Sequence, residues 1–340
     1  MRHINIPVFI PHLGCPNQCI FCNQRYISGT VEFNENDVKK TIESVLSTKG
    51  KNDECEIAFF GGSFTGIDRG LMVRLLDIAE EYVKKGDIIG IRMSTRPDYI
   101  SEEIIEILKR YTVTYVELGI QSMNNDVLRY LKRGHTKEDT VAAARLLKDS
   151  GIKFVGQMMV GLPKATLEDE LYCAEQICAL GADGARIYPT LVFKQTELEH
   201  LTEIGEYTPL DLHTAVERSA RVLGVFNKKS VNCIRIGLCD SDNLHSADTF
   251  VAGPNSPSIG EMVKSRMIFD FACDRLKSAD SFGKCLFFEC KPGLVSQVVG
   301  HKRKNIIDLK NIFGFKKIFV KENPYIDFIN LEIKEENSCV

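Results

Sequence analysis

Three cysteines stand close together near the start of the chain, in the run Cys15-Pro-Asn-Gln-Cys19-Ile-Phe-Cys22. Thiolates are ligands of zinc and of iron–sulfur clusters. The spacing CxxxCxxC supplies three ligands, one fewer than a ferredoxin cluster takes from its protein. A four-iron four-sulfur (4Fe–4S) cluster held in this way keeps one iron without a protein ligand, and an open coordination position can bind and activate a second molecule. The spacing therefore predicts such a cluster.

A structural zinc ion is the alternative, and it would need a fourth ligand close by. His12 is the only nearby candidate, since Cys55 and the group formed by Cys233, Cys239 and His245 are remote in the sequence. That group has the spacing Cys-x5-Cys-x5-His, which is not a usual zinc spacing. The chain has 12 cysteines, and those outside the triplet are scattered along it. We interpret most of them as small buried hydrophobic residues.

Strand patterns alternate with helix patterns over the first 190 residues, which is typical of repeated β–α units with a parallel sheet. We predict strands over 4–11, 55–60, 88–94, 115–120, 153–160 and 184–190. Helices are predicted at about 35–47, 71–84, 102–110, 124–131, 137–149 and 167–179. A complete eightfold barrel needs about 250 residues. The predicted fold class is therefore α/β, a partial (β/α)6 TIM-like barrel that carries the cysteines at the carboxyl end of its first strand.

The rest of the chain is predicted to add a cap and a small terminal unit. The cap comprises a polar connection over 191–209, a helix over 210–226, a strand over 232–238, a long loop over 240–260 and a helix over 261–276. The terminal unit has strands at 285–290, 316–320 and 328–333 and helices at 294–299 and 304–312. The predicted domains are 1–195, 196–280 and 284–336.

Composition limits the function classes. The chain has 340 residues, of which 44% are hydrophobic, and its net charge of -3 is close to zero. No stretch of about 18 apolar residues occurs, so we expect no membrane partner and a soluble, cytoplasmic protein. Any affinity for nucleic acid must come from a local basic surface.

The cysteine run, with Phe21 directly before the last cysteine, resembles the radical S-adenosylmethionine (SAM) superfamily. This resemblance implies that Cys15, Cys19 and Cys22 hold a 4Fe–4S cluster, that SAM binds its open iron, and that a low-potential electron donor is a partner. A second run, 59–66, ends the second predicted strand, where the family's glycine pair meets SAM. The residues implied there are Gly61, Gly62, Ser63 and Thr65.

The ends of the later strands resemble Elongator-type radical SAM proteins and the related oxygen-independent coproporphyrinogen oxidases. By this resemblance Arg96, Glu117 and Gln121 face the carboxylate and ribose of SAM. A mutual ion pair between Arg96 and Glu117 is the alternative. The further residues implied in the SAM site are Ser94, Gly161, Leu162 and Pro163. Arg186 and Tyr188 end the sixth strand and are our candidates for catalytic groups on the substrate side.

Two features depart from the Elongator pattern. The first cysteine spacing is shorter than in the Elongator catalytic subunit. The residues after the sixth strand also leave no room for an acetyltransferase domain beside the terminal unit. The resemblance therefore implies radical SAM chemistry more strongly than it implies a subfamily, and a cluster does not by itself define a substrate.

The terminal unit is locally basic. Its run Gly300-His301-Lys302-Arg303-Lys304 lies between two predicted helices and resembles the GxxG loop with which KH domains clamp nucleic-acid backbone. Arg303 replaces the second glycine, which removes the room for close backbone approach and adds attraction for phosphate. Gly300, Lys302, Arg303 and Lys304 are the candidate RNA contacts. A solvated cap whose lysines bind nothing is the equal alternative.

These observations favour a radical SAM enzyme that acts on RNA, with a tRNA base as the leading substrate. Two alternatives stay open. One is a radical SAM enzyme acting on a porphyrin-like small molecule. The other is a non-catalytic iron–sulfur protein that binds RNA.

Overall fold

The structure is a computed structural model, and it describes residues 2–15, 19–28, 32–239, 244 and 246–335. The chain separates into two compact units. Residues 1–211 and 225–255 form the first, here called the barrel unit, and residues 212–224 and 256–340 form the second, here called the terminal unit. The predicted three-part division stays a prediction.

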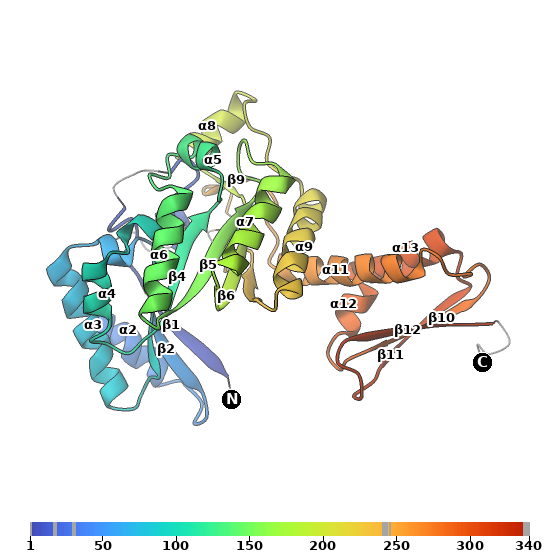
Figure 1. Cartoon of the computed structure of the whole chain (residues 1–340), viewed down its shortest axis with the longest axis horizontal. Helices are drawn as coiled ribbons and strands as arrows, with labels where there is room; N and C mark the ends of the chain where they lie inside the picture. Colours follow the sequence, from blue (N-terminus) through green and yellow to red (C-terminus); the bar gives the residue numbers. More distant parts are fainter. Residues whose placement is uncertain (1, 16–18, 29–31, 240–243, 245, 336–340) are drawn as a thin grey trace. The chain divides into compact units, whose positions relative to one another are not determined.

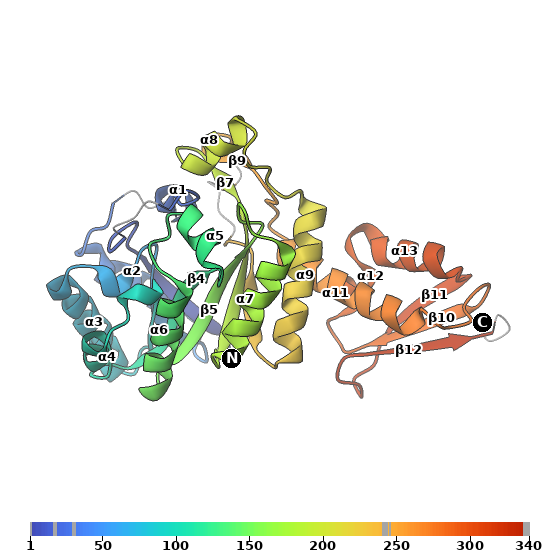
Figure 2. The same cartoon turned by 45° about the horizontal axis from the view of Figure 1, so that its top comes forward.

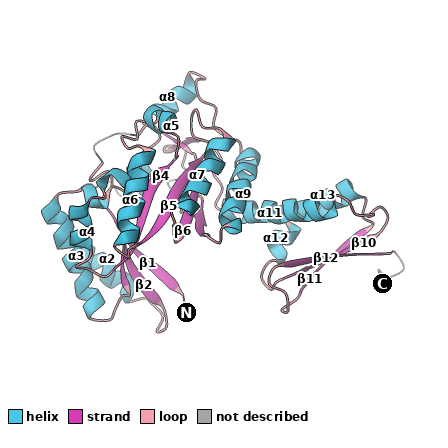
Figure 3. Cartoon of the chain, viewed as in Figure 1, coloured by secondary structure: helices cyan, strands magenta, loops and turns pink. Residues whose placement is uncertain are grey.

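A seven-stranded sheet forms the centre of the barrel unit (Figure 3). Every pair of neighbouring strands in it is parallel. The strands follow the chain order across the sheet: β1 (His3–Phe9), β2 (Glu54–Phe60), β3 (Gly90–Thr95), β4 (Val113–Gln121), β5 (Lys153–Val160), β6 (Gly184–Pro189) and β8 (Asn232–Ile236). The predicted α/β partial barrel is confirmed, and all seven strands present their carboxyl ends to one edge.

Helices follow the strands in the predicted alternation (Figure 1). They are α1 (Gln24–Ser28), α2 (Asp37–Leu46), α3 (Arg69–Lys84), α4 (Glu102–Leu108), α5 (Asn125–Tyr130), α6 (Lys137–Asp149) and α7 (Leu167–Ala179). Local chemistry sets where they begin. Thr136 and Thr166 each form a capping box with an aspartate three residues later, which satisfies amide groups at the starts of α6 and α7.

The region after β6 is richer in structure than we predicted. The connection over 191–209 contains strand β7 (Val192–Phe193) and helix α8 (Glu197–Glu203). β7 pairs with β9 (Phe250–Ala252), which lies within the predicted long loop. Strand β8 was assigned to a cap, and that was wrong. It pairs with β6 and extends the main sheet, as a short edge strand whose exposed side chains hide its role in the sequence.

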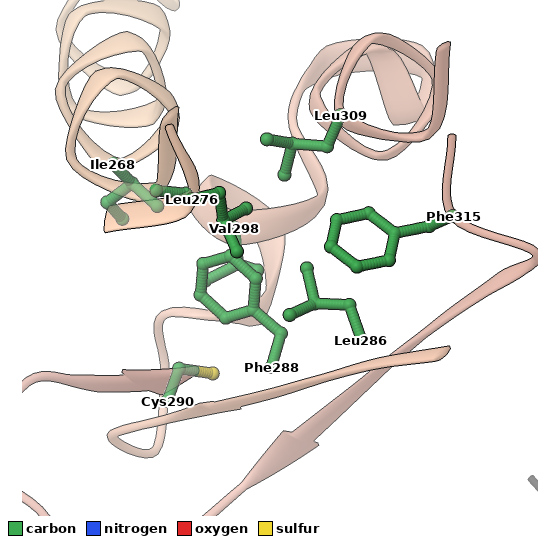
Figure 4. Packing of buried hydrophobic residues seen from close by; sticks show 9 residues of the cluster. Ile268, Leu276, Leu286, Phe288, Cys290, Val298, Leu309 and Phe315 are labelled. Carbon is green, nitrogen blue, oxygen red and sulfur yellow. The ribbon is translucent and has the colours of Figure 1, made fainter. Parts of the chain in front are cut away.

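The terminal unit is a three-stranded sheet with helices on one side (Figure 2). Its elements are α11 (Ile259–Leu276), β10 (Cys285–Cys290), α12 (Val295–Val299), α13 (Lys304–Phe313), β11 (Lys317–Glu322) and β12 (Ile329–Lys334). A helix α9 (Leu212–Lys228) spans the boundary between the two units. Figure 4 shows the core of the terminal unit, where Leu286 and Phe288 of β10 meet Ile268 of α11, Val298 of α12 and Leu309 of α13.

In the described part of the chain, no helix is both long enough and apolar enough to span a membrane.

Candidate active site

A cavity of about 280 Å³ opens at the carboxyl ends of the strands in the barrel unit. In parallel α/β sheets this edge is where ligands bind. Most of the predicted site residues line the cavity, and they come from segments far apart in the sequence: Cys15, Cys19, Phe21, Cys22, Gly61, Gly62, Ser63, Ser94, Arg96, Glu117, Gln121, Arg186 and Tyr188. The fold thus brings the cysteine triplet and the strand-end motifs together in one place.

Each cysteine of the triplet has a polar neighbour. The Sγ of Cys15 lies 3.5 Å from the Oγ of Ser63, and Gln24 Nε2 donates to the Sγ of Cys22 at 3.5 Å. Arg133 Nη1 donates to the Sγ of Cys19 at 3.4 Å. Burial, followed by the charge of neighbouring Cys19, raises the pKa of Cys22 to about 12. Three thiolates in this pocket therefore need a compensating cation, which is what bound iron supplies.

The arrangement fits a cluster better than a zinc ion. Within the described residues, no group of three His, Cys, Asp or Glu side chains is placed to hold a single metal ion. A zinc ion would draw its sulfur ligands to about 2.3 Å from one point. In a 4Fe–4S cluster each cysteine binds a different iron, so the three sulfurs stand farther apart around a shared cavity.

The cavity wall also carries polar atoms that need a ligand. Arg96 Nη1, Arg133 Nε and Gln121 Oε1 are buried and make no hydrogen bond within the described part of the chain. Buried polar atoms are normally paired, because an unpaired one keeps its full desolvation cost. Two guanidinium donors match a carboxylate, and an amide oxygen accepts from an amine or a hydroxyl. This donor set fits the amino-acid part and ribose of SAM.

Glu117 has partners other than the one we considered. The alternative of a mutual ion pair with Arg96 was wrong, because Arg96 is held by Asp98 through two bonds of 2.9 and 2.7 Å. Glu117 Oε1 instead accepts from Arg92 at 3.0 Å and from Arg186 at 2.7 Å. Its Oε2 accepts from Gln157 Nε2 at 2.6 Å.

This buried group extends across the inner strands of the sheet. Arg92 also pairs with Glu56, at 3.0 Å, so the charges form the chain Glu56–Arg92–Glu117–Arg186 across β2, β3, β4 and β6. Arg186 Nη1 donates to the Tyr188 hydroxyl at 3.4 Å. Burial raises the pKa of Tyr188, so its phenol stays protonated at neutral pH. The network therefore fixes the two residues that we predicted on the substrate side.

Four predicted contacts lie behind the cavity wall. Thr65 is buried and donates to the carbonyl of Tyr99 at 2.8 Å. Gly161 receives the Tyr207 hydroxyl on its carbonyl at 2.7 Å, and Leu162 belongs to a hydrophobic cluster with Ile20. These residues, with Pro163, are absent from the described lining of the cavity. Their contribution to SAM binding stays a prediction.

The glycine pair has a structural task that we did not predict. A Cβ on Gly62 would lie 2.3 Å from the carbonyl oxygen of Leu13, and one on Gly14 would lie 2.2 Å from that of Ser63. Ser63 N–H donates to Leu13 at 3.0 Å, and His12 N–H donates to Gly61 at 3.0 Å. The segment leading to Cys15 is thus joined to the glycine turn by close backbone contact.

We therefore expect Gly14→Ala to displace this segment. Gly14 has φ +70°, so alanine adds backbone strain as well as the clash with Ser63. Gly86→Ala is the matched control, because Gly86 has φ +78° and open space where a Cβ would be. Overpacking costs about 1–3 kcal/mol, so urea unfolding should show Gly14→Ala less stable than Gly86→Ala by that amount. Equal unfolding midpoints would show that the contact is loose.

His135 is buried beside the site and should give stability a pH dependence. Burial, followed by nearby Arg133, lowers its pKa to about 3. The unfolded value is about 6.5, so between pH 6.5 and 3 the unfolded chain binds the extra proton and stability falls as pH falls. The loss should be about 2 kcal/mol at pH 5 relative to neutral pH. Urea midpoints of the wild type and His135→Gln, measured from pH 7 to 5, should converge as pH falls, and parallel curves would contradict this.

Sequence reasoning missed several residues of the cavity. Arg133 follows α5 and reaches the triplet only through the fold, where its Nη2 donates to the Gly119 carbonyl at 2.8 Å. His12, which we had considered only as a zinc ligand, lines the cavity and accepts the N–H of Gln24 at 3.0 Å, and burial, followed by nearby Arg25, lowers its pKa. Gln157 did leave a signal, because a polar residue within the apolar strand β5 requires a partner.

Fold and site together define an enzyme that uses an iron–sulfur cluster and SAM, and comparison with known families agrees. Residues 9–175 match the family model of the Radical SAM superfamily, and residues 182–268 match that of the Radical_SAM C-terminal domain. The chain belongs to the radical SAM superfamily. Enzymes of this superfamily use a 4Fe–4S cluster and SAM, as our sequence analysis predicted.

Within the superfamily, the chain is similar to Elongator complex protein 3 and its archaeal relatives. It is 29% identical over 249 residues to a tRNA uridine(34) acetyltransferase of Methanocaldococcus jannaschii, covering 67% of this chain and 45% of that protein. It is 37% identical over 204 residues to Elongator complex protein 3 of Homo sapiens, covering 54% and 37%. The chain thus spans less than half the length of these two relatives.

A solved structure supports the same grouping. The chain is similar to Methanocaldococcus infernus Elp3, with 26% identity and a TM-score of 0.62 over 78% of this chain and 62% of that one. The predicted Elongator-like resemblance is therefore confirmed at the level of fold and family.

Proposed function

We propose that this protein is a radical SAM enzyme that modifies an RNA base, with a tRNA as substrate. The observation that carries the proposal is the single cavity that holds three cysteines together with buried, unpaired polar atoms of Arg96, Gln121 and Arg133. A site that only stored a cluster would have no use for this second set of atoms.

Each side chain then has a role. Cys15, Cys19 and Cys22 hold the cluster, and the guanidinium groups of Arg96 and Arg133 bind the carboxylate of SAM. When bound, the cluster and SAM would supply hydrogen-atom abstraction from the substrate, with the electron for SAM cleavage coming from an external low-potential donor.

The remaining lining residues shape the site around the reacting groups. Phe21, Phe60 and Met159 line the cavity with apolar surface and exclude water. Ser63, Ser94 and Gln121 add hydrogen-bonding groups at the ends of the strands. Arg186 and the protonated phenol of Tyr188 face the substrate side, where Tyr188 can donate a hydrogen bond.

RNA as the substrate is supported by two observations. Curated relatives include proteins named as tRNA uridine(34) acetyltransferases. The terminal unit also presents the short loop from Gly300 to Arg303 between α12 and α13, followed by Lys304 at the start of α13, with Lys302, Arg303 and Lys304 exposed. Lys302 and Arg303 both have positive φ, of 50° and 63°. We propose that this loop contacts RNA phosphates.

The test is 5′-deoxyadenosine formation from SAM by anaerobically reconstituted protein, with dithionite as the electron donor and with or without bulk tRNA. We expect turnover that tRNA stimulates. Turnover that tRNA does not change but a porphyrin-like molecule stimulates would show a radical SAM enzyme whose substrate is a small molecule and not RNA. No turnover from a fully loaded cluster would overturn the proposal in favour of a non-catalytic protein that binds RNA.

A further inference from the structure

The sheet of the terminal unit has two different faces. Leu286 and Phe288 of β10 point into the core beneath the helices (Figure 4). Ile318 and Val320 of β11 pack against the same core. Because side chains alternate along a strand, the residues between them lie on the other face. We call this the outer sheet face, and it comprises Cys285, Phe287 and Glu289 of β10, Lys317, Phe319 and Lys321 of β11, and Asn330, Glu332 and Lys334 of β12, of which Cys285 is fully buried.

Two aromatic rings lie side by side on this face. Phe287 of the central strand is in register with Phe319 of the edge strand, and their rings are stacked with centroids 4.9 Å apart and planes at 16°. The Nζ of Lys334 lies 4.8 Å from the centroid of the Phe287 ring, so that ring already has a cation on it. Phe319 is 36% exposed and is the ring that remains accessible.

Positive charge surrounds the accessible ring. Lys317 and Lys321 flank Phe319 on the same strand and the same face, each about 6.6 Å along the chain direction. Both are exposed, and neither makes an ion pair within the described part of the chain. Of the acidic residues of the face, Glu332 pairs with Lys334 at 2.9 Å, and Glu289, which lies opposite Lys321 in register, accepts from the neutral amide of Asn323 at 3.1 Å.

We propose that the outer sheet face binds single-stranded RNA, with a base stacked against Phe319 and phosphates beside Lys317 and Lys321. Proteins that bind single strands combine an aromatic ring for stacking with cations that follow the backbone, and this face has both. In naming RNA the inference rests on the proposed function. It assigns a surface separate in sequence from the loop at Gly300–Lys304.

A purely structural role is the competing explanation. Cross-strand aromatic pairs stabilise sheets, and lysines on an edge strand discourage aggregation. The two explanations differ in what they predict for RNA binding by folded protein. The test is therefore equilibrium binding of a short fluorescein-labelled RNA of mixed sequence to the full-length, reconstituted protein, followed by anisotropy from about 50 to about 200 mM salt.

Variants at the lysines and at the ring should affect binding in different ways. Lys317→Gln with Lys321→Gln should weaken binding about tenfold and reduce the slope of log K against log salt by about 1.4, the value for two phosphate contacts on a single strand. Phe319→Leu keeps apolar bulk in the sheet and should weaken binding about tenfold with the slope unchanged, whereas Phe319→Tyr should retain affinity.

Controls separate this surface from general charge effects. Lys84→Gln with Lys85→Gln removes two exposed lysines at the C-terminal end of α3 in the barrel unit and should leave binding unchanged. With a 4-thiouridine RNA, photocrosslinking should label the peptide that contains Phe319. Wild-type affinity and slope in all the sheet variants, or loss only in Lys302→Gln with Arg303→Gln, would overturn the inference. SAM cleavage is read separately, so failure of this surface leaves the tRNA-stimulated turnover intact.

Discussion

Cys22→Ala protein will cleave SAM reductively no faster than protein without a cluster. Cys22 lines the cavity beside Cys15 and Cys19. Because only three cysteines bind the cluster, loss of one of them should prevent its stable binding. After anaerobic reconstitution, the variant should also contain less iron and sulfide per chain than the wild type. The measurements are 5′-deoxyadenosine formation with dithionite and the iron content of the same sample.

Cys178→Ala is the matched control for this result. Cys178 lies on α7, is partly buried and does not line the described cavity. Its alanine variant should bind iron and cleave SAM like the wild type. If Cys22→Ala protein still cleaved SAM, the assignment of the triplet as the cluster site would be wrong.

Glu117→Ala should cause the largest loss of stability among the variants considered. The carboxylate is fully buried and neutralises Arg92 and Arg186 together. Removal of one partner from a buried ion pair costs about 3–5 kcal/mol, because an uncompensated charge is left behind. Arg92 keeps Glu56, so Arg186 bears most of the effect. Urea unfolding in the absence of SAM should show the loss directly.

An exposed ion pair provides the comparison. Glu106 pairs with Lys109 at 2.8 Å on the surface of the barrel unit, and its side chain is 65% exposed. Glu106→Ala should change stability by less than about 1 kcal/mol, since surface pairs contribute little. A similar small effect from Glu117→Ala would mean that water enters the site and screens the network.

The sequence predicted those parts of the site whose residues stand in short local motifs. The cysteine spacing is local, and each strand-end motif lies beside an apolar run that shows where the strand ends. Parallel strands place such ends at one edge, so the cavity follows once the alternation of strands and helices is recognised. The resemblance to Elongator-type radical SAM proteins then assigned Arg96 and Gln121 to the same site as the triplet.

Other features depend on contacts that no local pattern encodes. Arg133 reaches Cys19 across 114 positions of the chain, and nothing in its own segment marks a sulfur partner. Glu56 and Arg92 each interrupt an apolar strand, which signals a buried partner but does not identify it. Strand β8 looked like part of a cap because an exposed edge strand lacks the continuous apolar run of its inner neighbours.

The backbone contact between Gly14 and the glycine turn also affects whether the chain folds before or after the cluster is inserted. It consists of peptide groups held by the folded chain, with bonds such as Ser63 N–H to Leu13 that require no metal. Zinc fingers fold only when their metal binds. Here the start of the cysteine segment is anchored in advance, so we expect iron and sulfide to be inserted into a chain that has already folded. Biogenesis factors would then meet a chain in which the residues leading to Cys15 are already held in place.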